Sequence, residues 1–217
     1  MELIEQSVQG LVDYTSRQLE TFFPDGRQGT IKEVLSRHVD QALSRLEKCI
    51  NAVQMWPENK FNYLHSSQYC IYLYFLANTI WRNEADAVIC TKLFSLNKML
   101  NGIDLFYEIE MPDIFFIGHS VGIVLSKATY GNYLVLYQNS TVGKNHGVAP
   151  VIGEGVVMYP NTAIIGRCHI ADHTVLAMGT HIVNRDTPGN CFVFNAEQGA
   201  LVFKPPTRPV IKDIFRV

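Results

Sequence analysis

The 217-residue chain lacks the marks of membrane, secreted and nucleic-acid-binding proteins. Charged residues make up only 18% of it, the net charge is −2, and no basic stripe supports nucleic-acid binding. No run of eighteen apolar residues occurs, so we expect no membrane span. The acidic, amphipathic N-terminus lacks the basic start and apolar run of a signal peptide. These absences predict a cytoplasmic protein.

The five cysteines also show no pattern of paired disulfides or metal ligands. They are scattered, odd in number and without Cys-x-x-Cys spacing. This pattern argues against disulfides or a structural zinc site and indicates reduced thiols. With 47% apolar residues, the chain has enough material for a sizeable core in one or two small domains.

The first half of the chain has helical periodicity, with apolar residues three and four positions apart. Thr30 is a candidate N-cap with Glu33 three residues later, as in a capping box. The apolar stretch from Tyr69 to Ile80 indicates a buried helix. We expect four helices, over residues 3–19, from 31 to before Pro57, over 61–80, and over 85–100 with Asn101-Gly102 ending the last.

From Pro112 onward a period of six replaces the helical period. Apolar residues recur at six-residue steps: Tyr130, Leu136, Val142, and then Ile152, Met158, Ile164, Ile170, Leu176 and Ile182. Small or β-branched residues follow four positions later in the second series: Val156, Thr162, Cys168, Thr174 and Thr180. A β-sandwich with chance spacing explains only the first set. Both together predict a parallel β-helix in which three hexapeptides make one turn.

One polar, glycine-rich excursion interrupts the repeat. Ten residues rather than six separate Val142 from Ile152, and the segment between them runs from Gly143 to Pro150. Excursions from a rigid scaffold are where functional residues concentrate. Downstream, two apolar runs flank a glycine turn between Asn190 and Phe203, which predicts a hairpin that caps the coil. Pro205, Pro206 and Pro209 then predict an extended end.

Three motifs resemble those of hexapeptide acyltransferases of the serine acetyltransferase type. They are His119-Ser-Val-Gly-Ile-Val, Gln138-Asn-Ser-Thr-Val-Gly and Pro150-Val-Ile-Gly-Glu-Gly-Val, within a resemblance that spans residues 112 to 183. The resemblance implies a left-handed β-helix, acetyl-CoA as donor, a homotrimer or dimer of trimers, and active sites in clefts between neighbouring coils. It also implies that His119 is the general base.

The expected fold is therefore α+β: an N-terminal helical domain, a left-handed parallel β-helix, and a C-terminal hairpin and tail. We place these three parts at residues 1–108, 109–188 and 189–217.

The chain departs from the family pattern around the site. Gly118 replaces the carboxylate that precedes the histidine in the family and that holds the amine of serine. The family's second histidine falls at Ala149, with His146 three residues earlier, and the closing Gly-x-Pro-Ala motif is absent. These departures favour an amino sugar, including nucleotide-linked ones, as the acetyl acceptor. Serine O-acetylation is the alternative, and an inert scaffold is the second alternative.

Acetyl transfer needs a base, an oxyanion partner and substrates held in line. His119 is the first candidate base and His146 its rival. Glu110 or Asp113 is the candidate that orients the base. Backbone N–H groups around Gly143 are candidates for the oxyanion.

The resemblance assigns the pantetheine arm of coenzyme A to a groove between coils. The matching turns are Tyr159-Pro160-Asn161 and Ala177-Met178-Gly179, and candidate phosphate contacts are Lys144, Arg167, Arg185 and Lys204. We expect no metal. A zinc site at His169, His173 and His181, as in β-helix carbonic anhydrases, is disfavoured because residues 169 and 181 lie two faces apart.

Overall fold

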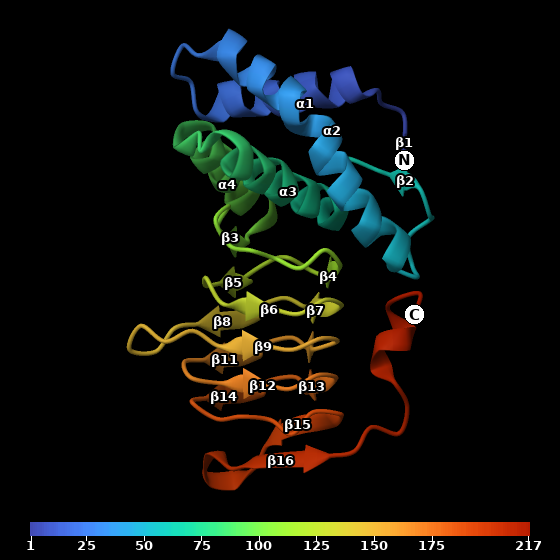
Figure 1. Ribbon diagram of the computed structural model, residues 1–217, viewed down its shortest axis with the longest axis vertical. Helices are drawn as coiled ribbons and strands as arrows, with labels where there is room; N and C mark the ends of the chain where they lie inside the picture. Colours follow the sequence, from blue (N-terminus) through green and yellow to red (C-terminus); the bar gives the residue numbers. More distant parts are fainter.

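A helical domain sits on one end of a β-helix in the computed structural model of the chain (Figure 1). The structure describes the backbone of residues 1–217 and every side chain except that of Gln28. The coil descends turn by turn from the helices, and the last residues return along its side (Figure 1). Within the described part of the chain, no helix is long and apolar enough to cross a membrane.

Four helices form the N-terminal domain. They are α1 (Val8–Phe22), α2 (Gln28–Ala52), α3 (Ser66–Glu84) and α4 (Ala87–Asn101), with a short parallel pair of β1 (Glu2–Leu3) and β2 (Lys60–Phe61) beside them. The predicted burial of the third helix is confirmed, because all residues from Ser67 to Ile80 are buried. The predicted end of the fourth is also confirmed, with Gly102 at a φ of 63° that suits glycine.

Three predicted helix starts are wrong. The helix α1 begins at Val8 rather than at residue 3, because residues 2 and 3 pair with β2 and Ser7 is the N-cap, with its side chain accepting from Gly10 N. The helix α2 begins at Gln28 after Arg27, so Thr30 lies inside it and is no N-cap. The helix α3 begins at Ser66 rather than Phe61, because side-chain hydrogen bonds hold the preceding residues in a turn. The Asn62 side chain accepts from Leu64 N at 3.0 Å, and Asn62 N donates to Gln68 Oε1 at 2.8 Å. Such local bonds compete with the helix.

The remaining half forms the predicted parallel β-helix, with three sheets of stacked strands. One sheet contains β4 (Phe115–Ile117), β7 (Leu134–Leu136), β10 (Val157–Met158), β13 (Thr174–Leu176), β15 (Cys191–Asn195) and β16 (Leu201–Lys204). The second contains β3 (Asp104–Leu105), β5 (Val124–Leu125), β8 (Thr141–Gly143), β11 (Ala163–Ile165) and β14 (His181–Val183). The third contains β6 (Thr129–Tyr130), β9 (Val151–Ile152) and β12 (His169–Ile170).

The six-residue repeat places side chains in a continuous internal stack. Ile152 and Ile170 are 1% and 0% exposed, and they pair directly in adjacent turns. Ile164 lies between Val142 and Ile182 in the same way. The small residues of the second series are all buried at the corners. Burial of one apolar residue per strand therefore explains the period.

The coil starts and ends differently from a bare stack of repeats. Its first strand is β3, where Asp104 pairs with Val124, so pairing begins before the expected boundary at residue 109. At the other end, β15 adds to β13 in parallel, and β16 returns antiparallel to β15, which confirms the predicted hairpin. A hairpin covers the open end of the last turn.

Residues 205–217, called here the strap, form a packed segment that the sequence did not predict. After the prolines, the chain turns through a 3-10 helix, η2 (Val210–Asp213), and reaches the helical domain. There Phe215 is fully buried, and its backbone forms an antiparallel β-bridge with Val53. The Arg216 guanidinium donates to four carbonyl oxygens in the last turn of α2 and the residues that follow it, at 2.7 to 3.0 Å. The expected extended end is therefore a packed element.

Candidate active site

His119 lies on one edge of the coil, where the six-stranded sheet turns into the five-stranded one. The turns stacked along this edge, called here the His119 edge, are residues 118–122, 137–140, 159–162 and 177–180. Backbone hydrogen bonds hold successive turns together, with Asn139 N to Val121 O at 3.0 Å and Asn161 N to Gln138 O at 3.1 Å. His119 is exposed at the top of this edge.

The helical domain packs against the coil at the residues just before His119. Ser67, in the first turn of α3, donates its hydroxyl to Gly118 O at 3.1 Å. The Trp56 ring packs edge-on against His65 at 5.6 Å and against Phe116 at 5.4 Å between centroids. The contacts of Ser67 with Gly118 and of Trp56 with Phe116 join residues 51 and 60 positions apart, and nothing in the local sequence signals them.

Aromatic rings line the outer surface of the same edge. Tyr137 stacks on Tyr159 with centroids 5.5 Å apart and an interplanar angle of 18°. The edge of Phe116 meets Tyr137 at 6.3 Å and 82°. Burial, with the neighbouring Tyr159 phenol, raises the pKa of Tyr137. The ring therefore stays neutral at physiological pH and offers an aromatic surface next to His119.

His146 lies elsewhere on the chain. His119 precedes β5, whereas His146 follows β8, and these two strands are parallel neighbours. The two histidines therefore lie at opposite ends of these strands, and one chain does not bring them together. The loop that carries His146 projects from the coil (Figure 1) and closes on itself through two hydrogen bonds between Asn145 and Val148, each 3.0 Å long.

The predicted orienting carboxylates are engaged away from His119. Glu110 pairs with Arg82, near the end of α3. The Ser67 contact to Gly118 is at the start of that helix, about 22 Å away at 1.5 Å per residue. Asp113 pairs with Lys48 at 2.9 Å, and β4 separates it from the His119 turn. The structure does not place either carboxylate beside His119.

Asp104 is a carboxylate that the fold brings to the residues directly after the His119 turn, and sequence reasoning missed it. Its backbone N–H donates to Ile123 O at 2.8 Å, and its carboxylate pairs with Lys98 at 2.6 Å. In the adjoining residues, Ser120 Oγ donates to Asn101 O at 2.6 Å. Asp104 is not among the predicted site residues because the sequence places residue 104 in the helical domain rather than in the first turn of the coil.

The candidate coenzyme A residues fall into two groups. Tyr159-Pro160-Asn161 and Ala177-Met178-Gly179 are consecutive turns of the His119 edge, joined by Gly179 N to Pro160 O at 3.0 Å. Met178 is 73% exposed. Gly143 and Lys144 lie at the far end of β8, beside His146. One chain thus presents two of the three predicted segments along the edge that carries His119.

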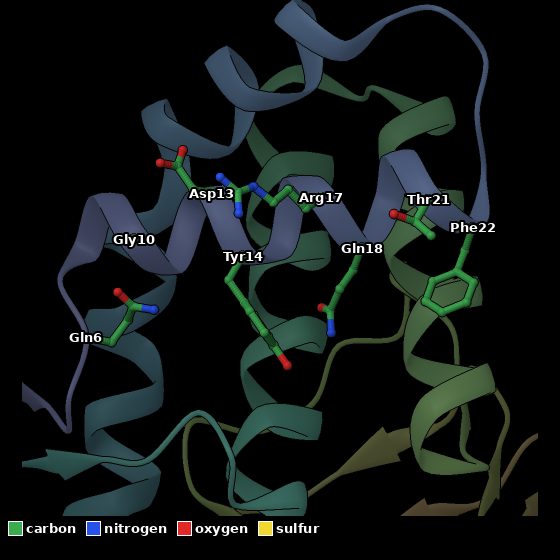
Figure 2. Close-up of a pocket in the computed structure, with 8 residues that line it drawn as sticks. All are labelled: Gln6, Gly10, Asp13, Tyr14, Arg17, Gln18, Thr21 and Phe22. Carbon is green, nitrogen blue, oxygen red and sulfur yellow. The ribbon is translucent and has the colours of Figure 1, made fainter.

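One cavity of a single chain, of about 500 Å³, touches the last turn of this edge at Gly179 and is also lined by His181 and Arg185. Two others lie away from the edge. Residues Gln6 to Phe22, on and just before α1, line an open cavity of about 580 Å³, shown in Figure 2. A second, of about 510 Å³, lies between the strap and the coil, with His173 and Val175 on one side and Arg208 and Lys212 on the other. Neither contains a residue predicted for acetyl transfer.

The three histidines considered for zinc stay apart in the fold. His169 is in β12, His173 is in a turn and His181 is in β14, on another sheet. Among the residues that the structure describes, no group of three or more histidine, cysteine, aspartate or glutamate side chains is arranged to hold a metal ion.

Comparisons with known proteins agree with the motifs. No protein-family model matches the chain. A serine acetyltransferase of Synechococcus elongatus is 26% identical over 137 residues, which cover 59% of this chain and 54% of that protein. The chain resembles serine acetyltransferases. It spans about half the length of this curated relative.

Solved structures extend the resemblance to the fold. The Neisseria gonorrhoeae serine acetyltransferase in complex with serine superimposes with a TM-score of 0.67 at 15% identity, covering 92% of this chain and 84% of that one. A serine acetyltransferase in complex with CoA gives a TM-score of 0.69 at 16% identity, covering 91% and 85%. The helical domain and left-handed β-helix are thus the architecture of these proteins.

Proposed function

We propose that this protein transfers an acetyl group from acetyl-CoA to the hydroxyl of a small acceptor, with serine as the first candidate. The observation that carries the proposal is an exposed histidine, in a His-x-x-Gly-Ile-Val motif, on the edge of a coil with serine acetyltransferase architecture. The curated relative is named for serine, and one superimposed structure holds serine. Serine therefore replaces the amino sugar as the favoured acceptor.

His119 acts as the base in this proposal. Its imidazole takes the proton of the acceptor hydroxyl as the oxygen attacks the thioester carbonyl. A C–O bond forms, the C–S bond breaks, and the proton passes from the imidazolium to the departing thiolate of coenzyme A. Asp104, on the adjoining turn, orients the imidazole and stabilises its charged form.

Acetyl-CoA lies along the His119 edge in this proposal. The turns at residues 159–161 and 177–179 offer backbone groups and the exposed Met178 side chain to the pantetheine arm. Gly143, Lys144 and His146 complete the cleft from a neighbouring copy, because they lie at the opposite end of the strands from His119. The proposed assembly is therefore a homotrimer or a dimer of trimers.

The test is release of free coenzyme A from acetyl-CoA, followed with a thiol reagent, against L-serine and a panel of amino sugars. We expect turnover with serine. His119→Ala should lower kcat by about 10²- to 10⁴-fold, the range for loss of a general base. Asp104→Asn should lower kcat by about tenfold or more. His169→Ala, at an exposed histidine on another sheet, is the matched control and should leave kcat unchanged.

Other outcomes separate the alternatives. Turnover with an amino sugar alone would reinstate that acceptor. Absence of turnover with every acceptor, from a folded protein that does not bind acetyl-CoA, would leave the inert scaffold. Equal kcat for wild type and His119→Ala would remove the proposed base.

A further inference from the structure

The strap encloses a cavity against the coil, on a side of the molecule that the proposed reaction does not use. His119 lies where the six-stranded sheet turns into the five-stranded one, and His146 lies at the opposite end of the five-stranded sheet. The cavity lies at the third corner, where β12 leads into β13 and His173 is in the turn between them. The strap runs along this side of the coil (Figure 1).

The backbone at this third corner carries larger side chains than the His119 edge does. Along that edge, the residues with positive φ are all glycine or asparagine: Gly122, Asn139, Asn161 and Gly179. At the third corner, Tyr133 has a φ of 60° and His173 a φ of 55°. Positive φ is uncommon for residues with a side chain. Tyr133 packs against Phe215 of the strap, and His173 lines the cavity, so both exceptions lie on the side of the coil that the strap covers.

The imidazole of His173 has a defined place in the cavity wall. A Cβ atom added to Gly155, one turn earlier, would lie 2.5 Å from His173 Nδ1 and 3.0 Å from Ile211 Cδ1. The imidazole and the strap residue Ile211 therefore fill the space that this glycine leaves empty. Val175 lies on the same wall, and Val175 and Ile211 are only 4% and 9% exposed. The wall thus combines an imidazole with an apolar surface.

The charged side chains that line the cavity are all cationic. The cavity has a volume of about 510 Å³, and the strap contributes Arg208 and Lys212 to it. None of the residues that line it is an aspartate or a glutamate. Nearby, Asp213 pairs with Arg208 at 2.9 Å, and the Asp172 carboxylate accepts from Glu154 N at 2.7 Å. A cavity lined by charges of one sign concentrates ligands of the opposite sign, so this one favours an anion.

Contacts of the strap with the helical domain hold the cavity open without a ligand. Phe215 is fully buried, and the Arg216 guanidinium donates to four carbonyl oxygens in and after the last turn of α2. Gln54 Nε2 donates to Lys212 O at 2.7 Å, which fixes the backbone that carries one of the two cations. A ligand therefore orders little of the strap when it binds, and binding to a preorganised site costs less free energy.

We propose that this cavity, called here the strap cavity, binds a small amphipathic carboxylate. The apolar body of the ligand lies against Val175 and Ile211, and its carboxylate accepts hydrogen bonds from Lys212, Arg208 and His173. A guanidinium has five N–H donors, so Arg208 can hold Asp213 and the ligand together. The site is separate from the proposed acetyl-transfer cleft, and the inference does not rest on that function.

The test is isothermal titration calorimetry of the full chain with three probes. Octanoate has an apolar body and a carboxylate, octanol has the same body without the charge, and inorganic phosphate has charge without the body. We expect saturable binding of octanoate at one site per chain, tighter than the binding of either other probe. Equal affinity for octanol or for phosphate, or no saturable binding of octanoate, would overturn the proposal.

Charge-removing variants assign the binding to the strap. Arg208→Gln/Lys212→Gln should lower the affinity for octanoate by about 2- to 30-fold, the combined range for two exposed ion pairs, with the affinity for octanol unchanged. Lys60→Gln/Lys204→Gln, at two exposed lysines outside the cavity, makes the same change in net charge and should keep the wild-type affinity. Equal losses in the two double variants would overturn the assignment.

A third variant tests the imidazole without disturbing the backbone. His173→Asn places at this position a residue that tolerates positive φ, and it should lower the affinity for octanoate by about 2- to 10-fold, the range for one lost hydrogen bond. Circular dichroism checks that each variant keeps the fold. An unchanged affinity in this variant would remove His173 from the site.

Competition separates the strap cavity from the proposed cleft. The affinity for octanoate should be the same with and without saturating coenzyme A. Displacement of octanoate by coenzyme A would place the probe in the acetyl-CoA cleft and overturn the inference. Failure of the protein to transfer acetyl groups would overturn the proposed function and leave the octanoate result standing.

Discussion

Glu84 ties two helices of the N-terminal domain together at their surface. Its carboxylate accepts hydrogen bonds from Arg37 Nε at 2.9 Å and from His38 Nε2 at 2.7 Å, both on α2. The hydrogen bonds from Arg37 and then His38 lower the pKa of Glu84 from 4.5 to about 2. The ionised form is thus favoured in the folded state.

The lowered pKa predicts how stability changes with acid. The contribution of Glu84 is fully present above pH 4.5, the ordinary pKa of the group, and is lost as the pH falls toward 2. Glu84→Gln should therefore destabilise the protein modestly at pH 7, because the site is partly exposed to solvent. The difference from wild type should shrink below pH 4, as measured by urea unfolding. A constant difference across this range would contradict the prediction.

At the scale of elements, the strap links the far end of the coil to the helical domain. It leaves the hairpin at the bottom of the coil and ends against α2 (Figure 1). Ile211, Ile214 and Phe215 are buried, and the Phe215 ring meets Tyr133 of the coil at 5.4 Å. Gln54 Nε2 donates to Lys212 O at 2.7 Å. The strap thus contacts both the coil and the helical domain.

Phe215→Ala should destabilise the protein by about 3 to 5 kcal/mol, the usual result of truncating a buried phenylalanine. Phe203→Ala, at a 40% exposed ring on the edge strand β16, is the control and should change the free energy of unfolding by about 0.5 kcal/mol or less. Chemical denaturation measures both. Equal effects of the two substitutions would show that the strap contributes nothing specific.

At the scale of the whole molecule, the proposed cleft predicts that active sites are shared between copies. His119 and His146 lie at opposite ends of adjacent strands, so a single chain cannot place both at one substrate. If both are needed, the His119→Ala and His146→Ala variants should each be inactive. Mixed assemblies would then contain some clefts with one intact histidine from each copy.

Denaturing the two variants together in equal amounts and refolding them should restore activity to about a quarter of wild type, since a random cleft combines the two intact partners with that frequency. Sedimentation should show the same assembly for the variants and the wild type. An active His146→Ala variant would remove His146 from the chemistry. A monomer in solution would remove the shared cleft.

Much of the fold was predictable because its determinants are local. Which side chain of a hexapeptide points inward depends on the residues of that hexapeptide. The stacking of Ile152 on Ile170 therefore follows from the six-residue spacing of apolar residues alone. The end of the fourth helix at Gly102 and the closing hairpin depend on turn residues a few positions apart. The helix start at Ser66 was missed because side-chain hydrogen bonds of Asn62 and Gln68 hold the preceding turn, and these bonds leave no trace in the periodicity. The start at Gln28 was missed because no side chain caps this helix, so it has no capping residue to find in the sequence.

The sequence by itself determined the coil, its repeat and the position of the histidine motif. Only the tertiary structure decided what packs against the residues just before His119: Ser67 and Tyr137 at Gly118, and the Trp56 ring at Phe116. The physical reason is that inward burial repeats along the chain, whereas the outer edge is built from residues many positions apart. Their contacts depend on how the turns stack and how the helices dock on them.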